Sequence, residues 1–247
     1  MIFISHRGES IDAPENTLPA FELSRQRNTS GMECDIHLTK DNVLVTIHDN
    51  HTGRVGNKKM DVENSTYAQL QTVDVSNGKA GFKNIKIPKF SQTLQHLGND
   101  RIFYIEIKGN DPAVIDAMIQ ELDNAQIAPE QVVMIAFAEE IVRIFKERYP
   151  SRKALLLVLC SINPHGHWTP SADELIAKLR ELNADGVDIG ANLHCINQEY
   201  VNKVKAAGFD FAVWTIDNEN IAKTFIDYGV DAITSNCAGY LQEIFDK

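Results

Sequence analysis

The feature that most constrains this chain is the regular alternation of short β-branched runs with amphipathic helical segments from end to end. Alternation of this kind is typical of βα units around a parallel sheet. Eight strands are predicted, at Ile2–Ser5, Met32–Leu38, Ile102–Ile107, Val132–Ala136, Ala154–Leu159, Gly186–Ile189, Phe211–Thr215 and Asp231–Thr234. Eight such pairs in 247 residues predict an α/β fold, a closed (β/α)8 TIM barrel formed by a single domain over residues 1–247.

The helical segments between these strands carry start and stop signals. Gly208 and Gly229 stand where helices are predicted to end, because glycine readily adopts the left-handed conformation that closes a helix. Asp217 stands where another helix is predicted to begin, because its side chain caps free backbone N–H groups. These signals agree with the spacing of the strands.

One stretch interrupts the alternation after the second strand. A turn-forming segment at Thr39–Asn42 is followed by Val43–Ile47, which is predicted to be the return arm of a β-hairpin. The polar segment 51–88 is too long for an ordinary connecting loop. We therefore expect a small insertion on the barrel rim, folded and near the active site.

Charge and hydropathy restrict the partners and the location of the chain. With 24 basic and 34 acidic residues the formal charge is −10, which repels polyanions, so nucleic acid is not expected as a partner. An anionic substrate would need a local positive patch. No apolar run approaches the ~20 residues of a membrane span, and a strand begins at Ile2 with no room for a signal peptide. These observations predict a cytoplasmic protein without stable membrane insertion, and leave a homo-oligomer open.

The first strand ends in His6, Arg7 and Gly8, at the end of the barrel where active sites lie. The planar guanidinium of Arg7 is suited to a phosphate, and Gly8 would let the backbone pass closely by a ligand. A histidine by itself is more often a surface or core residue than a functional one. His6 is therefore a candidate only in the context of its neighbours.

Acidic residues follow one another on the second and third strands. The two-residue period of a strand directs Glu33 and Asp35 to one face, and likewise Glu106 and Lys108. Carboxylates held together repel each other, and a divalent cation keeps them ionised. Three oxygen donors suit Mg²⁺ or Ca²⁺ better than Zn²⁺. The alternative is a set of ordinary ion pairs, such as Glu106 with Lys108.

Two further candidates lie at the ends of other strands. His48, after the hairpin arm, would bring a second imidazole to the site, and two histidines can act as base and acid in phosphodiester cleavage. Asp49 would orient a neighbour or cap the loop. Trp214 places a large aromatic ring at the barrel mouth, where it either stacks on substrate or fills the barrel end.

At these residues the chain resembles the glycerophosphodiester phosphodiesterases, in particular short cytosolic members, whose sequences open with HRG followed by PENT. The matching segments run in order from residue 6 to about residue 236. They are His6-Arg7-Gly8, Pro14-Glu15-Asn16-Thr17, Glu33-Cys34-Asp35-Ile36, Thr39-Lys40-Asp41, His48-Asp49, Ile87-Pro88, Glu106-Ile107-Lys108 and Trp214-Thr215. Each segment is short, but the ordered set is specific.

The resemblance implies a TIM barrel that hydrolyses glycerophosphodiesters to sn-glycerol 3-phosphate and an alcohol with one divalent cation. The implied roles are metal binding by Glu33, Asp35 and Glu106, acid and base catalysis by His6 and His48, and substrate binding by Arg7, Lys108 and Trp214. The PENT segment is expected to be mainly structural, with Asn16 or Thr17 opening the first helix and Glu15 supporting the site.

The chain departs from the family where the last strand ends, with Ser235-Asn236-Cys237-Ala238 in place of a frequent Thr-Asp-x-Pro. We expect Asn236 to cap the last helix, with little effect on chemistry. The sequence leaves open whether the cation is Mg²⁺ or Ca²⁺, and which histidine is the base. It also leaves two other functions: a phospholipase D-like enzyme acting on lysophospholipid or sphingomyelin, and a non-catalytic barrel that binds phosphate esters.

Overall fold

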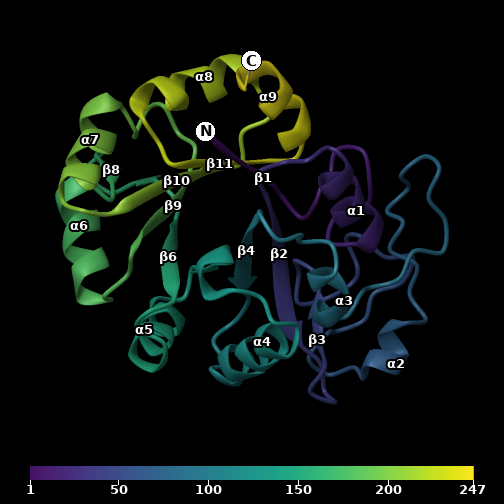
Figure 1. The fold of residues 1–247 in the computed structure, drawn as a ribbon. Coiled ribbons are helices and arrows are strands. Elements are labelled where there is room, and N and C mark those ends of the chain that lie inside the picture. Colours follow the sequence, from purple (N-terminus) through teal and green to yellow (C-terminus); the bar gives the residue numbers. More distant parts are fainter. Residues whose placement is uncertain (247) are drawn as a thin grey trace.

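The computed structural model describes residues 1–246 as a barrel of parallel strands surrounded by helices (Figure 1). The barrel strands are β1 Ile2–Ser5, β2 Gly31–Leu38, β4 Ile102–Ile107, β5 Val132–Ala136, β6 Lys153–Val158, β9 Gly186–Gly190, β10 Asp210–Trp214 and β11 Ala232–Ser235. Their order is β1-β11-β10-β9-β6-β5-β4-β2, and pairing of β1 with β2 closes the ring. The predicted (β/α)8 barrel is confirmed.

Helices follow the strands and cover the outside of the barrel (Figure 1). They are α1 Leu18–Gln26, α3 Phe90–Leu94, α4 Ala113–Asn124, α5 Glu139–Arg148, α6 Ala172–Glu181, α7 Gln198–Ala206, α8 Glu219–Tyr228 and α9 Ala238–Phe245. Gly229 ends α8 in the left-handed conformation, as predicted. The predicted start of α8 at Asp217 is wrong by one residue, because the side chain of Asn218 accepts the backbone N–H groups of Asn220 and Ile221. None of the helices in residues 1–246 is long and apolar enough to cross a membrane.

The core has two layers because side chains of a strand alternate between its two faces. In β4, Phe103, Ile105 and Ile107 pack outward against the helices, whereas Tyr104 points into the barrel. The apolar interior is small: Ile4, Tyr104, Val133, Ile135, Leu155, Leu157, Ala212 and Ala232. Polar side chains therefore occupy the inward positions nearest the carboxyl ends of the strands.

The predicted hairpin is present, since β3 (Leu44–Thr46) pairs antiparallel with β2. The following segment, which includes α2 (Tyr67–Leu70), lies to one side of the barrel (Figure 1). It packs on its own apolar cluster of Val45, Ile47, Val55, Val62, Leu70, Val73, Val75 and Ile87. A 3-10 turn, Pro129–Gln131, precedes β5, and a short hairpin, β7 (Ser161–Ile162) with β8 (Trp168–Thr169), follows β6.

Candidate active site

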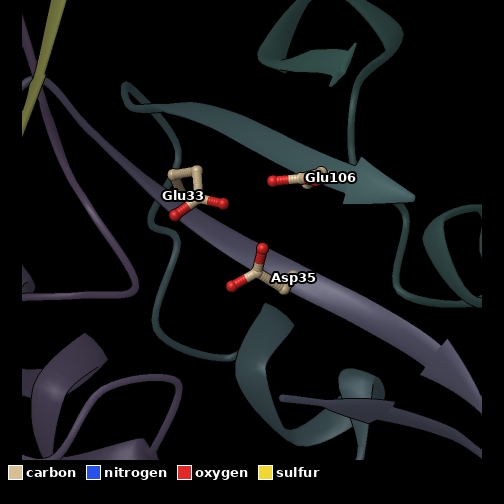
Figure 2. A group of neighbouring side chains, drawn as sticks. All are labelled: Glu33, Asp35 and Glu106. Carbon is tan, nitrogen blue, oxygen red and sulfur yellow. The ribbon is translucent and has the colours of Figure 1, made fainter. Parts of the chain in front are cut away.

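Three acidic side chains from adjoining strands meet inside the carboxyl end of the barrel (Figure 2). Asp35 of β2 lies directly beside Glu106 of β4 in the strand register, and Glu33 lies two residues earlier on the same face. One oxygen from each carboxylate lies within 4.8 Å of the other two. All three side chains are buried. The predicted gathering of the acids is therefore found.

The three carboxyl groups differ in pKa because their surroundings differ. Burial and the charge of Asp35 raise the pKa of Glu33 well above its usual value, and the same two causes raise the pKa of Glu106 to about 8. Burial opposes ionisation of Asp35 too, but the positive charges of Lys108 and Arg7 outweigh it and lower its pKa. Arg7 and Lys108 therefore do not supply enough positive charge to keep all three carboxyl groups ionised, and a divalent cation would do so.

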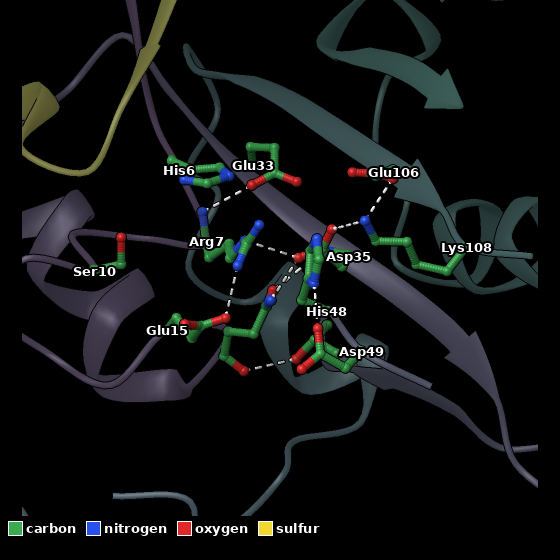
Figure 3. Close-up of polar contacts among 12 residues, drawn as sticks. His6, Arg7, Ser10, Glu15, Glu33, Asp35, His48, Asp49, Glu106 and Lys108 are labelled. Carbon is green, nitrogen blue, oxygen red and sulfur yellow. Dashed lines mark hydrogen bonds and ion pairs between the residues drawn. The ribbon is translucent and has the colours of Figure 1, made fainter. Parts of the chain in front are cut away.

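Two basic side chains flank the acids from either side (Figure 3). Arg7 Nε lies 3.2 Å from Asp35 Oδ2, and Lys108 Nζ lies 3.0 Å from Asp35 Oδ1 and 2.6 Å from Glu106 Oε1. Arg7 also donates to Glu15 at 2.8 Å. The ion pair between Glu106 and Lys108 that the sequence offered as an alternative is therefore present, but it is part of a larger cluster centred on Asp35.

Two polar side chains of the PENT segment, Asn16 and Thr17, have different roles. Asn16 adopts a left-handed conformation (φ 55°), and its side chain donates to Asp35 Oδ2 at 2.7 Å. Thr17 occupies the N-cap position of α1, although its hydroxyl donates back to the Pro14 carbonyl. Asn16 thus orients a site carboxylate, and Thr17 marks the start of the helix.

Gly8 serves helix packing, and the expectation that it lets the backbone pass closely by a ligand stays a prediction. Its φ is +76°, and a Cβ placed there would lie 2.5 Å from the carbonyl carbon of Ala20 in α1. Any side chain would therefore collide with the backbone of the helix. This contact fixes the turn that follows β1 and, with it, the position of Arg7.

His6 is held by Asn236, which comes from the far end of the chain. The ring atom Nδ1 lies 2.8 Å from Asn236 Oδ1, and Asn236 Nδ2 donates to Asp217 Oδ2 at 2.7 Å. A carboxylate only accepts hydrogen bonds, so Asp217 fixes the orientation of the Asn236 amide. Nδ1 of His6 must then carry the proton, which leaves Nε2 free to accept one.

This arrangement corrects the prediction that Asn236 caps the last helix, since the N-cap position of α9 is Cys237. Asp217, predicted to begin a helix, likewise serves Asn236 instead. Burial and the nearby charge of Arg7 lower the pKa of His6 to about 4. The imidazole is therefore neutral at physiological pH.

His48 has a different partner. Its Nδ1 lies 2.6 Å from Asp49 Oδ1, and Arg54 donates to the other oxygen of Asp49 at 2.8 Å. Burial and the charges of Lys108 and Arg7 outweigh the carboxylate of Asp35 and lower the pKa of His48. Asp49 thus orients this ring, one of the two roles predicted for it. A carboxylate partner supports the imidazolium form, which the amide partner of His6 does not.

One pocket joins these groups. Its lining residues are His6, Arg7, Glu33, His48, Glu106, Ile135, Phe137, Leu157, Asp188, Trp214 and Thr234. The Trp214 ring lies 5.8 Å from Phe137 in an edge-on arrangement, and its Nε1 donates to the Asp188 carbonyl at 3.1 Å. Lys108 reaches the acids from an adjoining hollow. The eight predicted side chains therefore lie together at this end of the barrel.

The predicted site residues did not include Arg54, Asp188, Asp217, Thr234 or Asn236, which also belong to this region. Asp188 carried one readable signal, since it is an acid within the apolar run Val187-Asp188-Ile189. Asp217 and Asn236 had been assigned to helix ends because both residue types are common there. Thr234 gave no signal, because threonine is an ordinary strand residue.

The chain matches a known protein family over most of its length. The profile of the Glycerophosphoryl diester phosphodiesterase family matches residues 6–239. A glycerophosphodiester phosphodiesterase of Caldanaerobacter subterraneus is 27% identical, covering 95% of this chain and 93% of its own, and one of Bacillus subtilis is 24% identical, covering 96% and 83%. The barrel resembles an Oleispira antarctica phosphodiesterase solved with its product sn-glycerol-3-phosphate, with a TM-score of 0.88, 24% identity, and coverage of 100% and 97%. The chain belongs to the glycerophosphoryl diester phosphodiesterase family.

Proposed function

We propose that this chain hydrolyses glycerophosphodiesters to sn-glycerol 3-phosphate and an alcohol, with one divalent cation and two histidines. The observation that carries the proposal is a cluster of three carboxylates, two of which line one pocket together with two imidazoles and a guanidinium. The product bound to the Oleispira antarctica enzyme supports the same product here.

The cation would be held by Glu33, Asp35 and Glu106. Their donors are all oxygen atoms, which suit Mg²⁺ or Ca²⁺, and the raised pKa values of Glu33 and Glu106 indicate a place for added positive charge. A cation held by these residues would supply positive charge that neutralises the phosphodiester and its developing negative charge.

His6 is assigned as the general base. Asn236 accepts from Nδ1, which leaves Nε2 as a bare acceptor, and the low pKa of the ring keeps it unprotonated. It can then take the proton from the attacking hydroxyl. Asn236 and Asp217 act through His6, as residues that fix its tautomer.

His48 is assigned as the general acid. Asp49 accepts from its Nδ1 and opposes the lowering of the His48 pKa by burial, Lys108 and Arg7, and a protonated ring would donate Nε2–H to the oxygen of the leaving alcohol. Arg7 and Lys108 supply positive charge beside the acids and help to bind the phosphate.

Two routes remain for the attack on phosphorus. The nucleophile is either the glycerol 2-hydroxyl, which gives a cyclic phosphate that water opens later, or water itself. Phosphorus NMR during turnover separates them, because only the first route accumulates a cyclic phosphate when ring opening is made slow.

The function is tested with a panel of glycerophosphodiesters, with release of sn-glycerol 3-phosphate as the readout. Activity is expected with Mg²⁺ or Ca²⁺, to disappear with excess chelator and to return when the metal is added back. Full activity after exhaustive chelation would remove the metal from the proposal. Absence of hydrolysis, with phosphate esters still bound, would favour the non-catalytic barrel.

A lysophospholipid is the second candidate substrate, and one surface feature favours it. Phe137 and Leu157 line both the pocket and an adjoining groove, where Leu159 is 60% exposed. Apolar side chains exposed next to a site can contact an acyl chain. Comparing kcat/KM for glycerophosphocholine with that for lysophosphatidylcholine separates the two, and a preference for the lysolipid would replace our first assignment.

A further inference from the structure

Two polar side chains of the pocket have no task in the chemistry described above. They are Asp188 of β9 and Thr234 of β11, which are 1% and 2% exposed. Within residues 1–246, neither Asp188 Oδ1 nor Thr234 Oγ1 has a hydrogen-bond partner. Buried polar atoms are nearly always paired in folded proteins, so two such atoms lining one pocket require an explanation.

The fold directs both side chains into the barrel. Val187 and Ile189 pack outward against the helices, so Asp188 between them faces inward, where the strand register places it beside Leu157 and Ala212. Ile233 packs outward in the same way, which turns Thr234 inward. Both therefore face the interior space that the site uses.

Asp188 lies across the pocket from the acidic cluster. Three strands separate β9 from β2 in either direction around the ring, so Asp188 faces the wall that carries Glu33. Trp214 of β10 and Leu157 of β6 lie on the strands to either side of β9 and offer apolar surface beside Asp188. Thr234 lies on β11, which a single strand separates from β9 and a single strand separates from β2. A ligand whose phosphate lies at the acids would extend past Thr234, on the side of the pocket, and reach Asp188 and the apolar side chains at its far end.

We propose that Asp188 and Thr234 form a subsite that binds the free hydroxyl groups of a polyol, the glycerol portion of the substrate. The inference rests on the proposed function and names the residues that select the polyol. A carboxyl and a hydroxyl group can each bind an alcohol O–H, while Trp214 and Leu157 contact the C–H surface of the same small molecule. The pocket volume of about 40 Å³ holds about three water molecules, which excludes a long chain from this part of the site.

The first test compares two substrates in each variant: glycerophosphocholine, and methyl 4-nitrophenyl phosphate, which lacks free alcohol groups. T234V and D188V are expected to lower kcat/KM for glycerophosphocholine by about 10-fold or more, because each removes a hydrogen bond to the polyol. If water is the nucleophile, the rate on the methyl ester should stay within about 2-fold of wild type. If the glycerol 2-hydroxyl attacks, wild type does not hydrolyse this ester, and the binding test below decides alone. D188N, which keeps hydrogen-bonding atoms, should retain more activity than D188V.

Thr93 of α3 provides a matched control. Its hydroxyl is also buried without a partner among residues 1–246, but it lies outside the pocket. T93V should leave both substrates unaffected. T234V should unfold at a temperature no lower than wild type, since it replaces an unpaired hydroxyl with a methyl group, so a loss of activity would not reflect misfolding. Equal losses on both substrates, or no loss on glycerophosphocholine, would overturn the subsite.

The second test measures binding and does not need turnover. Calorimetry with Mg²⁺ present compares sn-glycerol 3-phosphate with methyl phosphate, which lacks the polyol. Wild type should bind sn-glycerol 3-phosphate more tightly, and D188V and T234V should remove most of that difference. If glycerophosphodiesters are not hydrolysed but this preference is present, the proposed function fails and the subsite stands. If hydrolysis occurs without the preference, only the subsite fails.

Discussion

Replacing Glu106 with glutamine should stabilise the metal-free protein while removing its activity. The glutamine would keep the shape of the side chain, and its amide oxygen could still accept from Lys108 Nζ, which lies 2.6 Å from Glu106 Oε1. The replacement would remove a buried carboxyl group whose ionisation is opposed by burial and by Asp35. A side chain that binds a metal ion commonly lowers the stability of the folded protein when the metal is absent.

The size of the stability difference follows from the pKa of Glu106. This pKa is about 8 in the folded protein, and the ordinary value of 4.5 applies to the unfolded chain. Between these values the folded state binds more protons than the unfolded state, so wild-type stability falls as pH rises. The loss is about 1.4 kcal/mol per pH unit, or about 3 kcal/mol at pH 7, and levels off above pH 8. E106Q lacks this loss, so its advantage over wild type should grow across the same range.

Urea unfolding in excess chelator at pH 5, 6, 7 and 8 measures this difference. Glu130 is exposed and lies outside the acidic cluster, so E130Q serves as a control for the same replacement elsewhere in the protein. Added Mg²⁺ or Ca²⁺ should stabilise wild type more than E106Q, because cation binding requires the ionised carboxylate. An E106Q advantage that does not grow with pH, or equal stabilisation of both proteins by the cation, would refute the electrostatic account of this site.

The other predictions concern the two histidines and the basic residues. H6A and H48A should each lower kcat about 10²-fold or more, and wild-type turnover in both would contradict the acid and base assignment. N236D should raise the pKa of His6, since a carboxylate stabilises imidazolium, and move the acid limb of the kcat/KM profile upward by about 1 pH unit; an unmoved limb would contradict the role of Asn236. K108M should weaken inhibition by inorganic phosphate, measured as Ki, and an unchanged Ki would place the phosphate away from Lys108.

The sequence alone determined the barrel and the acidic cluster, because both depend on local periodicity. A two-residue period sends Glu33 and Asp35 to one face of β2, and parallel strands align their carboxyl ends, which brings Glu106 beside them. The hairpin after β2 was equally readable, from a turn segment between two apolar runs. For such features the chain order nearly fixes the position in space.

Only the tertiary structure decided what each polar side chain contacts. Asn236 and His6 are 230 residues apart, and they meet because β11 closes the ring against β1. From the sequence, Asn236 and Asp217 resembled helix caps, because asparagine and aspartate are common at helix ends. Asp188 became a candidate because its Oδ1 has no hydrogen-bond partner among residues 1–246. That observation requires knowing every neighbour that the closed barrel brings near this atom. Periodicity sets the face on which a side chain lies, whereas closure of the ring sets its partners.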